Sequence, residues 1–598
     1  MRSPARARSC PTYESAHEML TRTIYASSVI TSVVPGGSVD VTAATTLLPM
    51  RSTMMDAPLQ VARILEHGST VHGAAEVVTW TGAEPRRMTY AEVGRAAARL
   101  AHALRDECGV TSDERVATFM WNNNEHLVAY FAVPSMGAVL HTLNIRLFPD
   151  QVAYIANHAE DRVVLVDTTL IPLLARVIGE MTTVAHVVVV GGGDPAPLLA
   201  AAGDRITVHH WDALLADRPD HFDWPEVDER DAAALCYTSG TTGHPKGVAY
   251  SHRSIYLHSL QVCMPEGFGL GPNDRELAIV PMFHAMSWGL PYAAFLSGAS
   301  LIMPDRFLQA EPIAAMIAAE RPTLAGAVPT IWTDLLAYLD AHEVDLSSLK
   351  EVIVGGSACP PALMHAFHDR YGIDVIHAWG MTEMSPLGSV SRAPAGATGD
   401  DAWRYRYTQG RVPAGVTARI VGPAGEPLPA DGTSVGELEV RGPWVTARYI
   451  GDDVPEEEKF RDGWLRTGDV GTLSPDGYIT LTDRAKDVIK SGGEWISSVE
   501  LENALMAHPA VLEACVVGVP DERWDERPLA TVVVREGASV TAEELRDFLA
   551  GSVARWQLPE RWAFIDAVPK TSVGKFDKKV VRSRYADGGL DVRELTAS

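Results

Sequence analysis

Hydrophobic and polar positions in this 598-residue chain alternate in the order strand, helix, strand. The apolar run 163–166 is followed by an amphipathic stretch at 170–181 and by a second apolar run at 185–190, which ends at three glycines. The same order returns within 351–377. Short apolar runs separated by amphipathic helices are typical of parallel sheets covered by helices. We therefore predict an α/β fold with parallel-sheet layers.

Two later regions follow other patterns. Residues 417–450 contain short strand-like runs with Gly/Pro turns, which predicts a small antiparallel or barrel-like section. The tail has its own core: a helix starts at Ser497, 512–519 is strand-like, and a second helix starts at Thr541. We expect a small, mobile α+β C-terminal domain. The predicted boundaries are 50–482 for the large domain, 483–490 for a hinge and 491–598 for the small domain.

The first 49 residues are rich in Arg, Ser and Thr, contain few acids, and differ from the rest of the chain. We expect translation to start at Met50, so that residues 1–49 are a mis-assigned or disordered extension. A transit peptide is the alternative, since its composition is similar.

The charge balance limits the function classes. There are 51 basic and 76 acidic residues, and the net charge of −25 argues against a nucleic-acid binder. Six cysteines show no Cys-x-x-Cys pair and no His at ligand spacing, so neither a structural zinc nor a disulfide framework is indicated. We find no transmembrane segment, because no apolar run reaches about 18 residues. The expected location is the cytoplasm, with peripheral contact to a membrane surface as an option.

The clearest chemical signal is the segment 238–247, which reads Thr-Ser-Gly-Thr-Thr-Gly-His-Pro-Lys-Gly. It lies between the apolar runs 232–237 and 248–250. Glycines let backbone N–H groups approach phosphate oxygens, while hydroxyls and one lysine add further ligands. The spacing is not that of the P-loop NTPases. A hydrophilic surface turn is the alternative. The candidate nucleotide-binding residues of this loop are Thr238, Ser239, Gly240, Thr241, Thr242 and Lys246.

Further motifs follow in a fixed order along the chain. They are Pro-Met-Phe-His at 281–284, Gly-Gly-Ser-Ala at 355–358, Trp-Gly-Met-Thr-Glu at 379–383, Arg-Thr-Gly-Asp at 466–469, Asp-Arg-Ala-Lys-Asp at 483–487, Ser-Gly-Gly-Glu-Trp-Ile-Ser at 491–497 and Pro-Lys-Thr-Ser-Val-Gly-Lys at 569–575. From about residue 55 to about 580, the chain resembles the adenylate-forming superfamily. The versions at 494–497 and 574–576 resemble most the medium- and long-chain fatty acyl-CoA ligases.

The resemblance implies a nucleotide site and a reaction. ATP activates a carboxylic acid as its adenylate, Mg²⁺ bridges the phosphates and is held by Thr238 and Glu383, and CoA then takes the acyl group. Asp469 would accept hydrogen bonds from the ribose hydroxyls. The remaining nucleotide-binding candidates are Gly356, His377, Ala378, Trp379, Thr382, Arg484, Lys486, Lys490 and Trp495. Trp379 stands where the family more often has tyrosine, so the stacking face is kept but the phenol is lost. Glu383 taken alone also fits the first turn of a helix.

Lys575 is the main catalytic candidate. Its ammonium would neutralise the charge that develops between the carboxylate and the α-phosphate. A solvated basic tail is the alternative, because Lys570, Lys578 and Lys579 are close in sequence. The family rotates its C-terminal domain between the two half-reactions, and Gly492 and Gly493 would then let pantetheine pass close to the backbone.

The substrate class follows from His284, the second catalytic candidate. Amino-acid-activating relatives have an aspartate after the corresponding Phe, so an uncharged acyl tail is preferred here. Trp288 matches the tryptophan that gates the acyl tunnel in long-chain ligases, although a core tryptophan is the alternative. We expect a medium- or long-chain fatty acyl-CoA ligase, active as a homodimer.

Three other functions stay open or are disfavoured. An aryl-CoA ligase has the same motifs, and a non-catalytic acyl- or nucleotide-binding homologue would have the same fold. A peptide-synthetase module is disfavoured because 23 residues after Lys575 are too few for a carrier domain.

Overall fold

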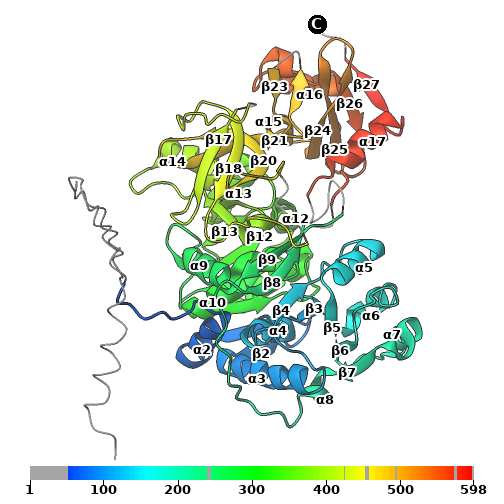
Figure 1. Cartoon of the computed structure of the whole chain (residues 1–598). Coiled ribbons are helices and arrows are strands. Elements are labelled where there is room, and N and C mark those ends of the chain that lie inside the picture. Colours follow the sequence, from blue (N-terminus) through cyan, green and yellow to red (C-terminus); the bar gives the residue numbers. More distant parts are fainter. Residues whose placement is uncertain are drawn as a thin grey trace, which may run out of the picture. The chain divides into compact units, whose positions relative to one another are not determined.

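The computed structural model describes residues 52–238, 244–422, 424–451, 457–491, 494–571 and 575–595, without the side chains of residues 494 and 495. The chain divides into two units, 1–56 and 57–598. The architecture described below is that of the second unit (Figure 1). The predicted extension 1–49 lies outside the described residues.

A seven-stranded sheet has the order β7-β6-β5-β3-β4-β8-β9. Its strands pair in parallel, except that β8 and β9 form an antiparallel hairpin. Valines that alternate along β5 and β6 enter two different cores, one on each face of the sheet. Helices α5 and α6 cover one face, and α3 and α4 lie on the other (Figure 1). The bounds are β3 Arg115–Phe119, β4 Val139–Thr142, β5 Asp161–Asp167, β6 His186–Val190, β7 Thr207–His210, β8 Ala232–Tyr237, β9 Gly247–Ser251, α3 Tyr90–Asp106, α4 Asn124–Ser135, α5 Pro149–His158, α6 Ile171–Leu174, α7 Ala196–Ala202 and α8 Trp211–Leu215.

The long helix predicted at 170–181 is wrong. Only α6, Ile171–Leu174, is α-helical, and turns follow it. The guanidinium of Arg205 donates hydrogen bonds to the carbonyls of Ile178, Met181 (2.7 Å) and Val184 (2.9 Å). The Arg205 side chain, which comes from a later segment, thus supplies the hydrogen bonds to these carbonyls in place of helical N–H donors.

The largest sheet has 14 strands, and its main path is β17-β18-β20-β21-β16-β15-β14-β13-β12-β10-β11-β1-β2. From β14 to β1 the neighbours are parallel. The predicted run 351–377 corresponds to β13 Glu351–Val354, α13 Pro361–Tyr371 and β14 Asp374–Gly380. The other elements of this block are β1 Glu76–Thr79, β2 Arg86–Thr89, β10 Arg275–Ala278, β11 Ser300–Met303, β12 Leu324–Ala327, α2 Val61–Val71, α9 His252–Cys263, α10 Leu290–Ser297, α11 Ala310–Glu320 and α12 Pro329–Leu339.

From β14 onward the same sheet becomes antiparallel. This part contains the section that the Gly/Pro turns of 417–450 predicted. Its elements are β15 Leu387–Val390, α14 Gly399–Arg406, β16 Gly410–Arg411, β17 Thr417–Val421, β18 Gly436–Arg441, β19 Phe460–Arg461, β20 Trp464–Leu473 and β21 Tyr478–Arg484.

The tail forms a separate six-stranded sheet with its own buried core. Ser497 and Thr541 cap the helices that follow them, and Thr541 makes a reciprocal capping box with Glu544. The elements are β22 Ile489–Ser491, β23 Glu494–Ile496, α15 Ser498–Met506, β24 Val511–Asp521, β25 Asp525–Val534, α16 Ala542–Leu549, β26 Arg561–Phe564, α17 Lys578–Ala586 and β27 Val592–Glu594. The predicted α/β fold with a large N-terminal and a small C-terminal domain is confirmed.

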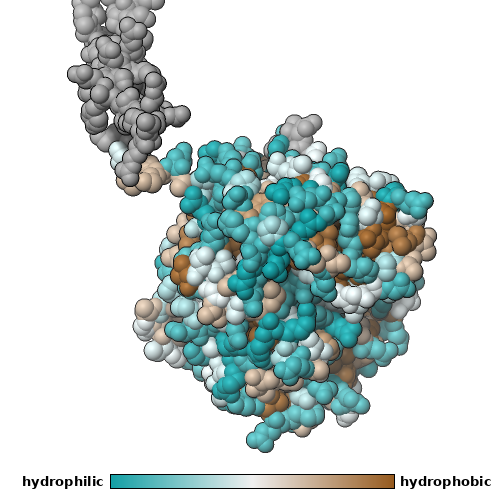
Figure 2. Space-filling model, turned by 90° about the horizontal axis from the view of Figure 1, so that it is seen from below, coloured by the Kyte–Doolittle hydropathy of each residue, from teal (hydrophilic) through white to brown (hydrophobic). Residues whose placement is uncertain are grey.

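The surface agrees with the acidic, polar composition. On the face drawn in Figure 2, hydrophilic residues predominate and the hydrophobic patches are separated from one another. Within the described residues, no helix is both long enough and apolar enough to cross a membrane.

Candidate active site

A cavity of about 720 Å³ lies between the strand ends of the large domain and the C-terminal segment around Lys575. Most of the predicted site residues line it. They are Thr238, Lys246, His284, Trp288, Gly356, His377, Ala378, Trp379, Thr382, Glu383, Asp469, Arg484, Lys486 and Lys575.

The other predicted residues have different places. Lys490 does not line the cavity; it is exposed on β22, and its backbone N–H donates to Glu526 Oε2 at 2.9 Å. Ser239, Gly240, Thr241, Thr242, Gly492 and Gly493 lie outside the described residues, as does the side chain of Trp495.

The Gly/Ser/Thr segment connects β8 to β9, and Thr238 and Lys246 at its two ends are hydrogen-bonded to each other. The N–H of Thr238 donates to the carbonyl of Lys246 at 2.9 Å, and the N–H of Lys246 donates to Thr238 Oγ1 at 3.1 Å. The Lys246 ammonium lies 5.0 Å from the centre of the Tyr449 ring. The hairpin therefore places a hydroxyl and a cation at the cavity wall.

Glu383 contributes a buried carboxylate to the same wall. It is 6 % exposed, and Tyr449 donates its hydroxyl hydrogen to Glu383 Oε1 at 2.7 Å. The preceding residue is also fixed, because the Tyr250 hydroxyl donates to the carbonyl of Thr382 at 2.6 Å. Oε1 of Glu383 thus accepts a hydrogen bond from a neutral hydroxyl of the protein.

Trp379, Asp469 and Arg484 form a hydrogen-bonded chain. Trp379 Nε1 donates to Asp469 Oδ2 at 3.0 Å, and Arg484 Nε lies 2.8 Å from Asp469 Oδ1. Strand pairing sets the second contact, because Asp469 on β20 is opposite Arg484 on β21. The tryptophan that replaces the family's usual tyrosine therefore keeps a polar contact as well as an aromatic face.

Lys575 reaches the loop after β13. A Cβ added at Gly356 would lie 3.7 Å from Lys575 Cε and 3.2 Å from Val328, and Gly356 has φ +84°. The left-handed backbone favours glycine here, and a Cβ would also press against the Val328 side chain. Burial and, to a smaller extent, the nearby charge of Arg484 lower the pKa of Lys575 to about 8, whereas Asp469 and Glu383 oppose the shift. The ammonium thus stands among the carboxylates of the cavity.

His284 and Trp288 border the inner part of the cavity. Burial lowers the pKa of His284 to about 3, with smaller contributions from Lys575 and Arg146, so its imidazole is neutral. Residues 285–288 form a left-handed turn with φ between 43° and 56°. Each such non-glycine residue costs of order 1–3 kcal/mol. This strained turn holds the Trp288 ring against Gly355 and Gly326.

Three residues that the sequence analysis missed complete the surroundings. Lys459 and Tyr449 line the cavity, and burial lowers the pKa of Lys459 although Glu383 is near. Glu276 on β10 is fully buried behind Trp288. None of the three lies in a recognised motif, and the charged run around Lys459 looks like a solvated loop in sequence.

Glu276 is a buried carboxyl close to the Trp288 ring. From the point where a Gly326 Cβ would stand, the Trp288 ring is 3.5 Å away and Glu276 Oε1 is 3.8 Å away. Neither carboxyl oxygen makes a hydrogen bond of normal geometry within the described part of the chain. Burial raises the pKa of Glu276 well above its ordinary value, so its carboxyl is protonated.

Comparison with known proteins agrees with this geometry. Residues 65–450 match the family model of the AMP-binding enzyme, and residues 500–575 match that of the AMP-binding enzyme C-terminal domain. The 3-methylmercaptopropionyl-CoA ligase of Ruegeria lacuscaerulensis is 43% identical over 546 residues, which are 90% of this chain and 99% of the relative.

Two further proteins are similar over nearly the whole length. The medium-chain-fatty-acid–CoA ligase of Ectopseudomonas oleovorans is 42% identical over 542 residues, 90% of this chain and 98% of the relative. The crystal structure of the anthranilate CoA ligase AuaEII in complex with anthranoyl-AMP aligns with a TM-score of 0.80 at 26% identity, covering 89% of this chain and 99% of that one. The chain therefore belongs to the AMP-binding enzyme family and is an AMP-forming acyl-CoA ligase of the adenylate-forming superfamily.

Proposed function

We propose that the protein ligates a medium- or long-chain fatty acid to CoA through an acyl-adenylate. The observation that carries the proposal is the position of Lys575 beside Gly356, in one cavity with Glu383, Asp469 and Trp379. The neutral His284 and the indole of Trp288 form the adjoining wall, and neither of these two side chains carries a negative charge that could pair with an amino group on the substrate.

In the first half-reaction, a carboxylate oxygen of the acid attacks the α-phosphorus of ATP, and the bond to the β-phosphate oxygen breaks. Two anions must approach each other, and the Lys575 ammonium offsets their repulsion. His284, as a neutral imidazole, can donate one N–H to the carboxylate. The thiol of CoA then attacks the acyl carbonyl and AMP leaves.

We assign the nucleotide contacts from the sequence motifs together with the residues that line the cavity. Trp379 offers its ring to adenine with Gly356, His377 and Ala378, and Asp469 accepts from the ribose hydroxyls. Arg484, Lys486 and Lys246 meet the phosphates, together with the loop from Thr238 to Thr242 and Thr382. Lys490 and Trp495 would act only after a movement of the C-terminal domain, as would Gly492 and Gly493 toward CoA.

Magnesium fits the donor set. Thr238 supplies a hydroxyl and Glu383 a carboxylate, and both line the same cavity. Hard oxygen donors of this kind suit Mg²⁺. When bound there with ATP, Mg²⁺ would neutralise phosphate charge. The protein's own part is to hold Glu383 in place through the Tyr449 hydroxyl.

A second candidate is the ligation of a short acid with a polar tail, and Glu276 favours it. A long alkyl chain that extended past Trp288 toward β10 would approach the buried carboxyl of Glu276. Burying apolar atoms against such a group gives up the hydrogen bonds it could form. A thioether or hydroxyl of the substrate at that depth would instead accept a hydrogen bond from the protonated carboxyl of Glu276.

The test is acid-dependent pyrophosphate release and thioester formation with octanoate, palmitate, 3-methylmercaptopropionate and benzoate. The highest kcat/KM with octanoate or palmitate supports the fatty-acid proposal, and the highest value with 3-methylmercaptopropionate supports the second candidate. Benzoate as the best substrate would make the protein an aryl-CoA ligase. No turnover with any acid would indicate a non-catalytic homologue and refute both proposals.

A further inference from the structure

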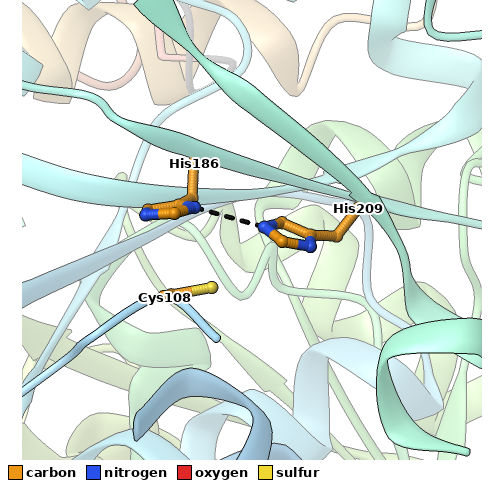
Figure 3. A group of neighbouring side chains, drawn as sticks. All are labelled: Cys108, His186 and His209. Carbon is orange, nitrogen blue, oxygen red and sulfur yellow. Dashed lines mark hydrogen bonds between the residues drawn. The ribbon is translucent and has the colours of Figure 1, made fainter. Parts of the chain in front are cut away.

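Three side chains with metal-binding atoms converge away from the active-site cavity (Figure 3). Cys108 follows α3, His186 begins β6, and His209 lies on β7. One ligand atom from each lies within 4.8 Å of the other two. The three residues are far apart in the sequence, so the search for short ligand spacings did not find them.

Strand register brings the two histidines together. β6 and β7 are parallel, with His186 opposite Thr207 and Val188 opposite His209. Because side chains alternate along a strand, residues 186 and 209 share one face of the sheet. Their rings stack with centres 5.4 Å apart, and His186 Nδ1 lies 3.2 Å from His209 Nε2.

These separations match a tetrahedral metal site. Two nitrogens bound to zinc at about 2.0–2.1 Å are about 3.3 Å apart at the tetrahedral angle. The observed separation is 3.2 Å. A thiolate at about 2.3 Å from the metal would lie about 3.6 Å from each nitrogen. The sulfur lies beside the gap between the rings (Figure 3), so a shift of about 1 Å or less completes the geometry.

The environment suits soft, neutral ligands. Cys108 is 1 % exposed, and His186 and His209 are half-buried. A metal ion that binds there displaces the thiol proton of Cys108. Arg162 and Glu107 are the charged groups whose fields reach the cluster.

We propose that Cys108, His186 and His209 bind a zinc-type transition metal ion, with water as the fourth ligand. A thiolate with two imidazoles selects Zn²⁺ or Co²⁺ over Mg²⁺. The ion would join β7, which is the edge strand of the seven-stranded sheet, to β6 and to the loop after α3. Its role is structural, since none of the three residues lines the ATP cavity.

The experiment is a Co²⁺ titration of the full-length protein after removal of metals, with excess Mg²⁺ present to occupy oxygen-ligand sites. We expect one equivalent of Co²⁺ to produce a near-ultraviolet thiolate-to-cobalt charge-transfer band and visible bands of tetrahedral cobalt. Zn²⁺ should abolish both. Because this measurement uses the wild-type protein, it does not depend on the folding of a variant.

Two variants and one control assign the ligands. Cys108→Ser should lose the charge-transfer band, and His209→Gln should weaken Co²⁺ binding at least tenfold. Cys263→Ser, at a half-buried cysteine whose thiol donates to Ala293, should bind like the wild type. Absence of a charge-transfer band in the wild type would overturn the proposal and leave a hydrogen-bonded histidine pair above a buried cysteine. A band that persists in Cys108→Ser would overturn it equally.

Discussion

At the scale of single residues, the decisive feature is the ammonium of Lys575 in a cavity rich in charged groups. Its alkyl stem approaches the glycine of the β13 loop, and its charge lies near Asp469, Glu383 and Arg484. A flexible lysine is suited to this position because a point charge can follow the reacting phosphate.

Replacing Lys575 with alanine tests this role. We expect Lys575→Ala to slow adenylate formation by about 10²–10³-fold, the usual loss when one electrostatic contact to a transition state is removed. Thioester formation from a supplied acyl-adenylate should stay near the wild-type rate. Lys579→Ala removes an exposed lysine of α17 and serves as the matched control. Equal loss in both half-reactions would contradict the assignment.

The same lysine predicts a pH dependence. Its pKa is lowered to about 8 in the free enzyme, so the ammonium is present below pH 8 and is lost above it. Because kcat/KM reports the free enzyme, kcat/KM for ATP in adenylation should fall up to tenfold per pH unit above about pH 8. In Lys575→Arg the guanidinium stays charged, so the alkaline fall should move to higher pH. An unchanged profile in that variant would exclude Lys575 as the titrating group.

At the scale of elements, the parallel strands β10, β12 and β13 lie beside Trp288, whose side chain lines the cavity. Two of them place glycines, Gly326 and Gly355, where the left-handed turn of 285–288 positions Trp288. The third places Glu276 on the buried face of β10. An acidic residue in a buried strand costs stability whenever it must ionise.

Glu276→Gln tests the protonation state of this carboxyl. Its pKa in the folded protein is raised above the ordinary value of 4.5 by burial. The contribution of this carboxyl to the free energy of unfolding is therefore fully present below about pH 4.5. It decreases as the pH rises toward the folded-state pKa. Glutamine stays neutral at every pH. The free energy of unfolding of the variant should therefore increase relative to that of the wild type by up to about 1.4 kcal/mol per pH unit in this range.

Unfolding measured in urea from pH 5 to pH 8 would show the difference between the two proteins. Glu226→Gln, at an exposed glutamate, should show no such trend. A pH-independent difference for Glu276→Gln would mean that the carboxyl is ionised in the folded protein as it is in the unfolded chain, and would contradict a raised pKa.

Secondary structure was predictable where local pattern and hydrogen bonding agree. The apolar runs at 232–237 and 351–354 are strands with the same bounds, and the Thr541 capping box begins α16. The helix prediction for 170–181 was wrong because Arg205, 24 residues beyond Met181, satisfies carbonyls of this stretch. An amphipathic pattern alone does not reveal such a distant donor.

At the scale of the whole molecule, the C-terminal domain supplies part of the cavity wall. Thr333 and Asp334 of α12 line it from one side, and Leu512 and Glu513 of β24 from the other. Lys570 pairs with Glu513 at 2.6 Å. Burial raises the pKa of Asp334, and the nearby charge of Lys570 opposes this shift. Asp334, Lys570 and Glu513 therefore form a charged contact across the two domains.

Reversing the charge of Lys570 should change the balance between the half-reactions. Lys570→Glu would place three carboxylates together in this arrangement of the domains, which we propose is the adenylation arrangement. We expect adenylation to slow several-fold while thioester formation from a supplied acyl-adenylate is preserved. Lys579→Glu makes the same charge change at an exposed site and should affect neither step. Loss of thioester formation alone would contradict this reading.

The hinge at 483–490 and the homodimer stay predictions.

The sequence by itself determined the family and the fold, and most of the site residues that it predicted line the cavity. These features depend on local signals: glycines that allow a close backbone approach, apolar runs that become strands, and motifs in a fixed order. The tertiary structure decided the rest, because these features depend on contacts between distant segments. Strand pairing joined Asp469 to Arg484 and His186 to His209, and close packing placed Glu276 behind Trp288. The spacing of residues along the chain does not reveal such contacts, because they form only when the sheets form.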